Sequence, residues 1–377
     1  MFAFFIPLTI IRCYNYSKLP KGYSTMENTP KILLLLTGGT IGSAVNDHCI
    51  NVDSSRGDDL LSYYREHHSR AVEFDVVRPF NILSENAEPK HWLKIIETLQ
   101  SYRLSDYDGV IIAHGSDTLP YTAAALSYGL DCPLIPIVLV AANYAIGERG
   151  SNAIANFSAV VEFISNMKLP GFYVIYKNSD HVIYVHLATR LQEADWLKDD
   201  FTSFGGPLGV FDHRGLCCVP TAKNPTMMKL YNPSPDDIPV VKEFRNEVLA
   251  LRAYPGLNYE VIDLQKRPIR AILHSLYHCG SGNVAGENGT SLLAFIKNNP
   301  HVDHYMISYK NIHGDLYASC QELITAGGIP LENISFEAAV TKLNFAYNQQ
   351  EFLPLNYMKR EFFYEFLREA QENGYVI

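Results

Sequence analysis

The stretch KILLLLTGGTIG, residues 31–42, constrains the fold of this chain most strongly. It begins as an unbroken apolar run and then breaks at two consecutive glycines that lie between Thr37 and Thr40. An apolar run of this length that ends in a turn predicts a parallel strand buried on both faces. Because ligands bind at the carboxyl ends of strands in open α/β sheets, the two threonine hydroxyls lie where a site is expected. Taken alone, the stretch favours an ordinary strand-to-loop turn.

A second stretch repeats this pattern. The strand expected at 107–113 ends in His114-Gly-Ser-Asp-Thr118, which again combines a glycine with hydroxyl and carboxylate side chains. In a parallel sheet both strand ends lie on one edge, so Ser116, Asp117 and Thr118 can converge with the threonines of the first stretch. A neighbouring carboxylate or base can activate a hydroxyl as a nucleophile, and backbone N–H groups at helix starts can hold an oxyanion. Together the two motifs predict an acyl-transfer site.

Strands and helices alternate from residue 31 to about residue 170, which predicts an α/β fold with a doubly wound, mostly parallel sheet. Strands are expected to begin at Lys31 and to cover 74–83, 107–113, 134–142, 171–176 and 181–187. Helices are expected at 58–68, from Pro89 onward, at 119–130 and at 153–167.

The chain is expected to contain two domains joined by a linker. Four prolines follow Asn224 within residues 222–240, and this segment offers few core candidates, so we expect it to be the linker. The larger N-terminal domain then covers 31–221. The smaller C-terminal α/β domain covers 241–377 and is expected to end in an amphipathic helix at 361–373.

Residues 1–30 are expected to form a leader that is disordered or absent from the mature chain. Its apolar run, Met1 to Ile11, has no positively charged region ahead of it and is too short to span a bilayer. A vestigial signal or anchor is the alternative. Elsewhere the sequence suggests no stable membrane association.

Composition narrows the function classes. The net charge of −9 and the lack of clustered Lys and Arg argue against nucleic acid as a partner. The seven cysteines are odd in number, irregularly spaced and without a CxxC pair, so neither a disulfide framework nor a zinc site is expected. Reduced thiols and a cytoplasmic location are the default expectation.

The two motifs resemble those of the bacterial-type L-asparaginase family, the asparaginase/glutaminase amidohydrolases. Residues 37–42 match the family form TGGTI, and residues 114–118 match HGTDT. Further similarity in 108–115, 254–256 and 337–345 extends the resemblance over about residues 30–350, and it is greatest to the cytosolic, type I branch. The resemblance implies hydrolysis of asparagine to aspartate and ammonia through an acyl-enzyme, without a metal or organic cofactor, in a dimer or tetramer.

The resemblance also assigns catalytic roles by position. Thr40 matches the nucleophile that attacks the side-chain amide, Ser116 matches the second catalytic threonine, and Asp117 matches the aspartate beside it. Arg190 replaces the family lysine that pairs with the second hydroxyl. Because arginine stays protonated, it could orient the Ser116 hydroxyl or stabilise negative charge, but it could hardly accept a proton.

Substrate-binding roles follow in the same way. Ser84 matches the serine that holds the substrate carboxylate, Glu85 lies next to it, and Asp117 also contacts the substrate amino group. Gly39 and Gly115 match the turn glycines whose backbone shapes the pocket. The loop after the first motif, residues 43–53, departs from the family because it has no tyrosine.

These departures leave other functions open. A glutaminase or another small-amide hydrolase is one alternative, and a non-catalytic relative that binds an amino acid is a second. The transamidation subunit that resembles this family has an additional domain before the first strand. Since about thirty residues precede Lys31, a transamidation function is not expected.

Overall fold

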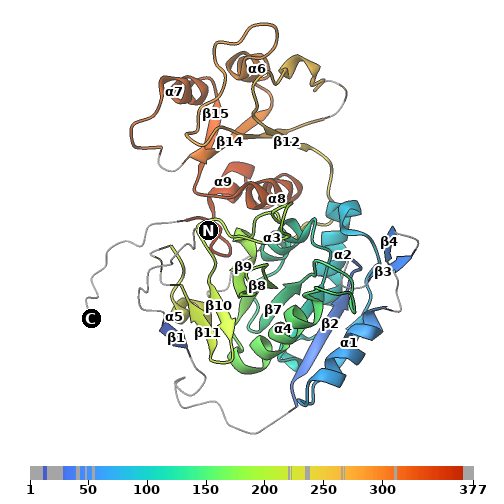
Figure 1. The fold of residues 1–377 in the computed structure, drawn as a ribbon. Coiled ribbons are helices and arrows are strands. Elements are labelled where there is room, and N and C mark those ends of the chain that lie inside the picture. Colours follow the sequence, from blue (N-terminus) through green and yellow to red (C-terminus); the bar gives the residue numbers. More distant parts are fainter. Residues whose placement is uncertain are drawn as a thin grey trace, which may run out of the picture.

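The larger of two main sheets forms the body of the protein (Figure 1). The computed structural model describes residues 12–14, 29–39, 43–46, 49–52, 56–219, 221, 223–233, 238–264, 266, 268–309 and 312–367. Within these residues the larger sheet has nine strands in the order β1-β11-β10-β9-β8-β7-β6-β2-β5. Their bounds are β1 Arg12–Tyr14, β2 Lys31–Leu36, β5 Glu73–Val77, β6 Gly109–Ala113, β7 Pro136–Val140, β8 Gly171–Lys177, β9 Ile183–Leu187, β10 Gly209–Asp212 and β11 Gly215–Cys218.

The parallel half of this sheet positions the candidate site. Strands β5, β2, β6, β7 and β8 run parallel, whereas β9, β10, β11 and β1 pair antiparallel. Leu36 at the end of β2 lies in register with Ala113 at the end of β6, so the two predicted motifs leave the sheet side by side. Both strands are buried on both faces, as their unbroken apolar sequences predict.

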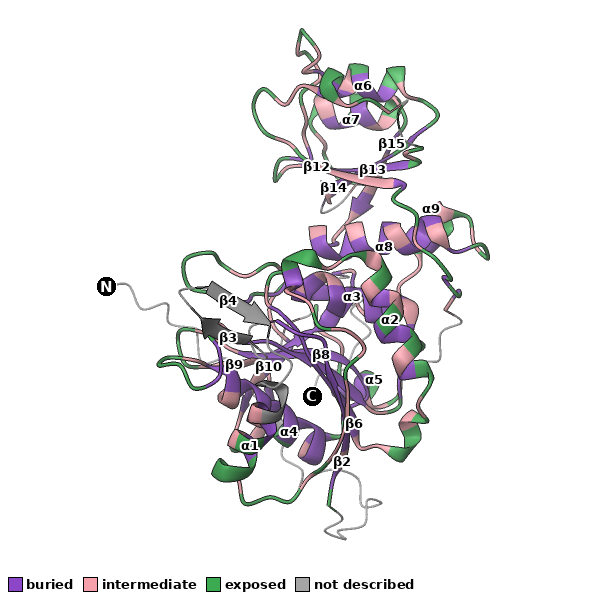
Figure 2. Ribbon diagram, turned by 90° about the vertical axis from the view of Figure 1, so that its right-hand side faces the viewer, coloured by how far each residue is buried: buried purple, intermediate pink, exposed green. Residues whose placement is uncertain are grey.

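Helices cover both faces of the large sheet, so the predicted doubly wound α/β fold is confirmed. Helices α1 and α4 pack together on one face, and α2 and α3 lie on the other (Figure 2). Their bounds are α1 Arg56–His67, α2 Pro89–Gln100, α3 Leu119–Gly129 and α4 Ala153–Met167. A separate hairpin joins β3 Ser43–Asn46 to β4 Cys49–Val52.

The smaller α/β layer begins after residue 247. Its four parallel strands are β12 Val248–Arg252, β13 Ala271–Ser275, β14 Asp303–Tyr309 and β15 Gly328–Glu332. The helices in this part of the chain are α6 Leu292–Asn298, α7 Ala318–Thr325, α8 Phe336–Asn348 and α9 Pro354–Lys359. Helix α8 lies between this sheet and α3 of the larger domain, and its apolar side chains belong to the large core (Figure 1).

Several boundaries differ from the sequence expectations. The strand expected at 74–83 ends at Val77, because the chain then turns toward the end of β2. The expected linker 222–240 contains α5 Met227–Tyr231, whose Met227 and Leu230 are buried in the large core. Within the expected leader, Arg12–Tyr14 pairs with β11, and the leader assignment of residues 1–30 stays a prediction.

The predicted last helix is also wrong where it can be checked. Residues 361–367 form no regular helix, and those after 367 lie outside the described part of the chain. Tyr364 has φ +58°, which a right-handed helix does not allow, and Glu365 and Leu367 are buried against the rest of the fold. None of the described helices is long and apolar enough to cross a membrane.

Candidate active site

Three chain segments meet at the carboxyl ends of β2 and β6. They are residues 37–39 after β2, residues 82–84 before α2, and residues 114–118 between β6 and α3. The N–H of Thr37 donates to the carbonyl of Ala113 (3.1 Å), and the N–H of Ile82 donates to the carbonyl of Thr37 (3.1 Å). The N–H of Gly39 then donates to the carbonyl of Ile82 (3.0 Å). Backbone hydrogen bonds therefore join the first segment to the second and to the end of β6, from which the third segment continues.

Glycine is required where the segments touch. Gly39 has φ +77°, and a Cβ added there would lie 2.3 Å from both Cα and N of Gly115. A Cβ added to Gly115 would lie 2.4 Å from Cβ and Oγ of Ser84. Real Cβ atoms do not approach backbone so closely, so the two turns can pack at this distance only without side chains.

Side-chain hydrogen bonds complete the arrangement around Ser84. Its Oγ donates to Oδ2 of Asp117 (3.0 Å), and the Thr118 hydroxyl donates to the Ser84 carbonyl (3.0 Å). Ser84 is buried, Ser116 is half-buried, and Asp117 and Glu85 are exposed. The structure thus brings Ser84 and Asp117 into direct contact, with the Asp117 carboxylate still open to solvent.

Two polar side chains of the motifs, those of Thr37 and His114, make hydrogen bonds inside the protein. The Thr37 hydroxyl donates to the carbonyl of Ala113 (2.9 Å) and is almost fully buried, so it does not converge on the site as the sequence suggested. His114 Nδ1 donates to the carbonyl of Gly115 (3.0 Å), which leaves Nε2 to accept from the Thr122 hydroxyl (3.0 Å). Burial lowers the pKa of His114 to about 4, so the ring is neutral at physiological pH.

The predicted nucleophile, Thr40, lies outside the described residues. The chain is described up to Gly39, one residue before it, and that residue is already in contact with Gly115. The assignment of Thr40 therefore stays a prediction. The roles of Gly39, Ser84, Glu85, Gly115, Ser116 and Asp117 also stay predictions, although the structure brings Gly39, Ser84, Gly115 and Asp117 together.

The guanidinium of Arg190 is held by the carboxyl-terminal part of the chain. Its Nε donates to the carbonyl of Tyr364 (2.5 Å), and its Nη2 donates to that of Phe366 (3.4 Å). Its Nη1 donates to the carbonyl of Lys223 (2.9 Å) and to Oδ1 of Asn224 (3.2 Å). All three nitrogens therefore have acceptors inside the protein.

This placement differs from the expected partnership of Arg190 with Ser116. Arg190 ends the 3-10 turn η5 (Ala188–Arg190) and is almost fully buried. Burial lowers the pKa of Arg190 to about 10, so the side chain remains protonated at neutral pH. Its hydrogen bonds among the described residues support an architectural role, and its catalytic role stays a prediction.

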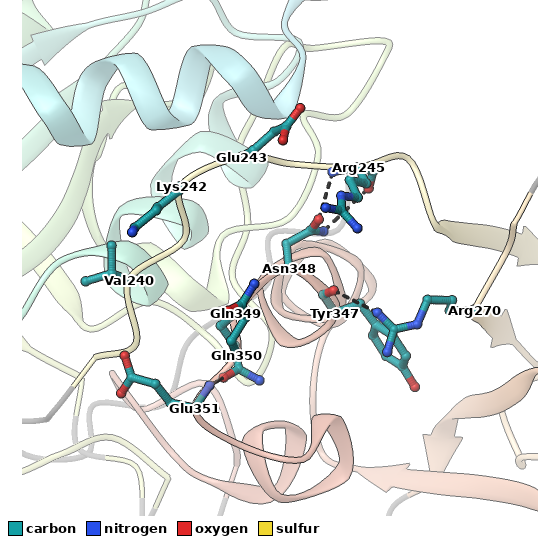
Figure 3. Close-up of a pocket in the computed structure, with 10 residues that line it drawn as sticks. All are labelled: Val240, Lys242, Glu243, Arg245, Arg270, Tyr347, Asn348, Gln349, Gln350 and Glu351. Atoms are coloured by element: carbon teal, nitrogen blue, oxygen red, sulfur yellow. Dashed lines mark hydrogen bonds between the residues drawn. The ribbon is translucent and has the colours of Figure 1, made fainter.

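A cavity of about 450 Å³ lies apart from these segments, between residues 240–245 and the end of α8 (Figure 3). Its walls carry Lys242, Arg245 and Arg270 together with Glu243 and Glu351. The mixed charges favour no single class of ligand. Within the described part of the chain, no group of three or more His, Cys, Asp or Glu could hold a metal ion.

Sequence reasoning named Ser84 but missed how its segment bridges the two motifs. The parallel bridge between Gly38 and Ile82 fixes the position of Ser84, and no periodicity around residue 82 predicts it. It also missed Thr122 as the partner of His114. The only available signal was that Thr122 lies in the first turn of the helix that follows the motif.

Comparison with known proteins gives a family match for part of the chain. Residues 31–215 match the family described as Asparaginase, N-terminal. A subunit of glutamyl-tRNA(Gln) amidotransferase from Thermococcus kodakarensis is 28% identical over 338 residues, which are 85% of this chain and 72% of that protein. An L-asparaginase from the same organism is 27% identical over 322 residues, which are 84% of this chain and 92% of that protein.

Solved structures agree with these matches. The thermostable L-asparaginase from Thermococcus kodakarensis superimposes with a TM-score of 0.71 at 25% identity, over 89% of this chain and 99% of that one. L-asparaginase I from Vibrio cholerae shares the fold, with a TM-score of 0.68 at 20% identity over 90% of this chain and 99% of that one. Residues 31–215 therefore match an asparaginase-family domain, and the similarity to an L-asparaginase extends over 84% of the chain.

Proposed function

We propose that the protein hydrolyses the side-chain amide of L-asparagine to L-aspartate and ammonia. The observation that carries the proposal is the contact of Gly39, Gly115 and Ser84 at the ends of β2 and β6, with the Ser84 hydroxyl bonded to Asp117. This contact places the Ser84 hydroxyl and the solvent-exposed Asp117 carboxylate together at the ends of the two strands. These groups suit a small substrate that carries both an ammonium and a carboxylate group.

The proposed chemistry uses a threonine ester. The Thr40 hydroxyl attacks the amide carbonyl, its proton passes to the leaving nitrogen, and ammonia departs from an acyl-enzyme. Water then attacks the ester, which releases the aspartate carboxylate and restores the hydroxyl. Asp117 would accept hydrogen bonds from the substrate ammonium group, and Ser84, with Glu85 beside it, would line the carboxylate end. Backbone N–H groups of the turns after β2 and β6, other than those of Thr37, Gly39 and His114, would hold the developing oxyanion.

The nucleophile assignment is tested with Thr40→Ala. This variant should fold normally and lose ammonia release from asparagine, because no other hydroxyl occupies the position after the two glycines. The measurement is a coupled assay of ammonia, with circular dichroism and a thermal melt to check the fold. Full ammonia release by the variant would contradict the assignment.

A glutamine amide is the second candidate substrate. Several relatives of 26–28% identity are named as a subunit of glutamyl-tRNA(Gln) amidotransferase, and the aligned regions cover about 71–74% of those proteins. Ammonia release from asparagine and from glutamine, measured at equal concentrations, separates the two substrates. A preference for glutamine would replace the first proposal while keeping the same site.

A non-catalytic amino-acid-binding role is favoured by one observation, the engagement of Arg190 with backbone carbonyls. Saturable binding of asparagine in calorimetry, without turnover over hours, would support that role against hydrolysis.

We also propose that the protein self-associates as a dimer or tetramer. Trp196 and Leu197, adjacent in one turn, are 95% and 88% exposed, and contact with a second copy would cover them. Light scattering after size exclusion tests this, and the cytoplasmic location stays a prediction.

A further inference from the structure

Three elements meet beside the first turn of α3, the helix that follows the HGSDT motif. The Tyr121 hydroxyl, in α3, donates to Oε1 of Glu193 (2.5 Å). The backbone N–H of Glu193 donates to Oε1 of Glu337, in the first turn of α8 (3.1 Å). Glu193 therefore receives one bond from α3 and gives one to α8, and it lies three residues after Arg190.

Glu337 carries a buried carboxylate oxygen that has no hydrogen-bond partner among the described residues. The residue is only 4% exposed, and its Oε2 makes no hydrogen bond to any described residue. A buried carboxylate oxygen without a partner costs free energy, so Glu337 is a poor choice for stability alone. Burial raises the pKa of Glu337, which favours the neutral acid in the folded protein.

The hydrogen-bonded set Tyr121–Glu193–Glu337, called the tie below, lies close to the candidate site both in sequence and in space. Tyr121 follows Thr118 by one helical turn, and Thr118 bonds directly to the carbonyl of Ser84. Helix α3 packs against both η5 and α8, so it touches the two elements that the tie joins. A shift of the loop around Glu193 would thus be transmitted to the turn that carries Ser116 and Asp117.

We infer that Glu337 and Tyr121 are positioning residues for amide hydrolysis, which they support by holding Glu193 and, through it, the start of α3. The inference rests on the proposed function, because it assigns these residues a role in that reaction. Neither residue is among the groups assigned to bind substrate. They fix the distance between the Asp117 turn and the loop that follows η5.

The test compares variants that keep or remove the acceptor at residue 337. Glu337→Gln keeps an oxygen for the N–H of Glu193 and should retain most of the wild-type kcat. Glu337→Leu removes the acceptor at similar volume, and a displacement of the α3 start should lower kcat by about tenfold to a hundredfold. KM should rise as well, because the displaced turn also carries Asp117, which is proposed to bind the substrate ammonium group, and Glu337→Gln should restore both parameters.

A second variant guards against misfolding of Glu337→Leu. Tyr121→Phe removes one hydroxyl from a half-buried side chain and should lower kcat by about fivefold, the typical effect of one lost hydrogen bond. Its matched control is Tyr107→Phe. The Tyr107 hydroxyl makes the same kind of bond, to Oδ2 of Asp75 (2.8 Å), but just before β6, at the opposite end of the strand from the site. The control should therefore retain wild-type kcat.

Rates are measured as ammonia release from the better of asparagine and glutamine, with folding checked by thermal melts. The inference is supported if Glu337→Leu and Tyr121→Phe have a low kcat while Glu337→Gln and the control Tyr107→Phe do not. An active wild type with unchanged kcat in both Glu337→Leu and Tyr121→Phe would overturn the inference alone. A wild type inert toward both amides would instead contradict the proposed function, and the role in the reaction would fall with it.

Discussion

Two polar regions of this protein are built in opposite ways. At the ends of β2 and β6, backbone bonds and glycine contacts fix the chain, and the Asp117 carboxylate is left open to solvent. At the junction of α8 with residues 360–367, buried charged side chains hold the two segments together. There Lys342 Nζ lies 2.6 Å from Glu365 Oε1, and both side chains are fully buried.

This difference distinguishes charged residues that are available to a ligand from charged residues that hold the fold together. Every oxygen of Glu365 is occupied, because the N–H groups of Phe362 and Phe363 also donate to it. Arg190 belongs to this second region, since its nitrogens donate to the carbonyls of the same segment. A charged residue at a motif position can therefore serve the fold, whereas a carboxylate on a glycine-fixed turn remains available for a ligand.

The largest effect is expected from breaking the buried ion pair. Lys342→Met leaves the Glu365 charge buried without its cation and should lower the free energy of unfolding by about 3–5 kcal/mol. The measurement is denaturant-induced unfolding. The double variant Lys342→Met/Glu365→Gln removes both charges and should recover part of that loss. If the single variant were as stable as the wild type, the junction would not depend on the pair.

A smaller loss of stability, but a large loss of activity, is expected from Gly39→Ala. The new Cβ would meet the backbone of Gly115 at 2.3 Å and would also occupy φ +77°, so the two turns must separate. Backbone strain of about 1–3 kcal/mol is expected, and a separation near 1 Å should lower ammonia release about a hundredfold. Gly256→Ala is the control, because Gly256 has φ +88° and no atom within 4 Å of the added Cβ. Equal activity losses in both variants would remove the steric argument.

Much of the fold could be predicted from the sequence because its signals are local. The apolar runs of β2 and β6 identify buried parallel strands, and Pro89 marks the start of α2 at the residue observed. The last helix could not be predicted correctly, because Glu365 and Leu367 are held by distant residues. Lys342 bonds Glu365, and the carbonyl of Asn333 accepts from the N–H of Leu367.

The candidate site was predictable in part for the same reason. The glycines of both motifs require sharp turns, and the parallel sheet brings those turns together. The environment of Arg190 was not predictable, because its acceptors come from residues 223–224 and 364–366, far away in the sequence. The bond between Ser84 and Asp117 likewise depends on a bridge at Ile82 that no sequence period encodes.

Arg190→Lys sharpens the boundary between the two regions. Lysine carries a single ammonium group in place of the guanidinium, so some of the four acceptors would lose their donor. The free energy of unfolding should fall by about 1–3 kcal/mol, as expected for buried carbonyls left unpaired. The measurement pairs denaturant unfolding with ammonia release per folded molecule. Lost ammonia release at wild-type stability would instead place Arg190 with the catalytic groups.

The smallest effects are expected from pH, and they have opposite signs for His114 and Glu337. The folded pKa of His114, about 4, is below the unfolded value near 6.5, so its contribution to stability is present above pH 6.5 and lost as pH falls. Between pH 6.5 and 5.5 this loss is about 1 kcal/mol, and His114→Gln should abolish it.

The folded pKa of Glu337 is instead raised by burial, so its contribution to stability is present below its unfolded pKa and lost as pH rises. Glu337→Gln should therefore flatten the stability profile above about pH 4.5, the opposite limb from His114→Gln. Unfolding curves measured from about pH 4 to 8 check both, and changes on the same limb would contradict the assigned environments.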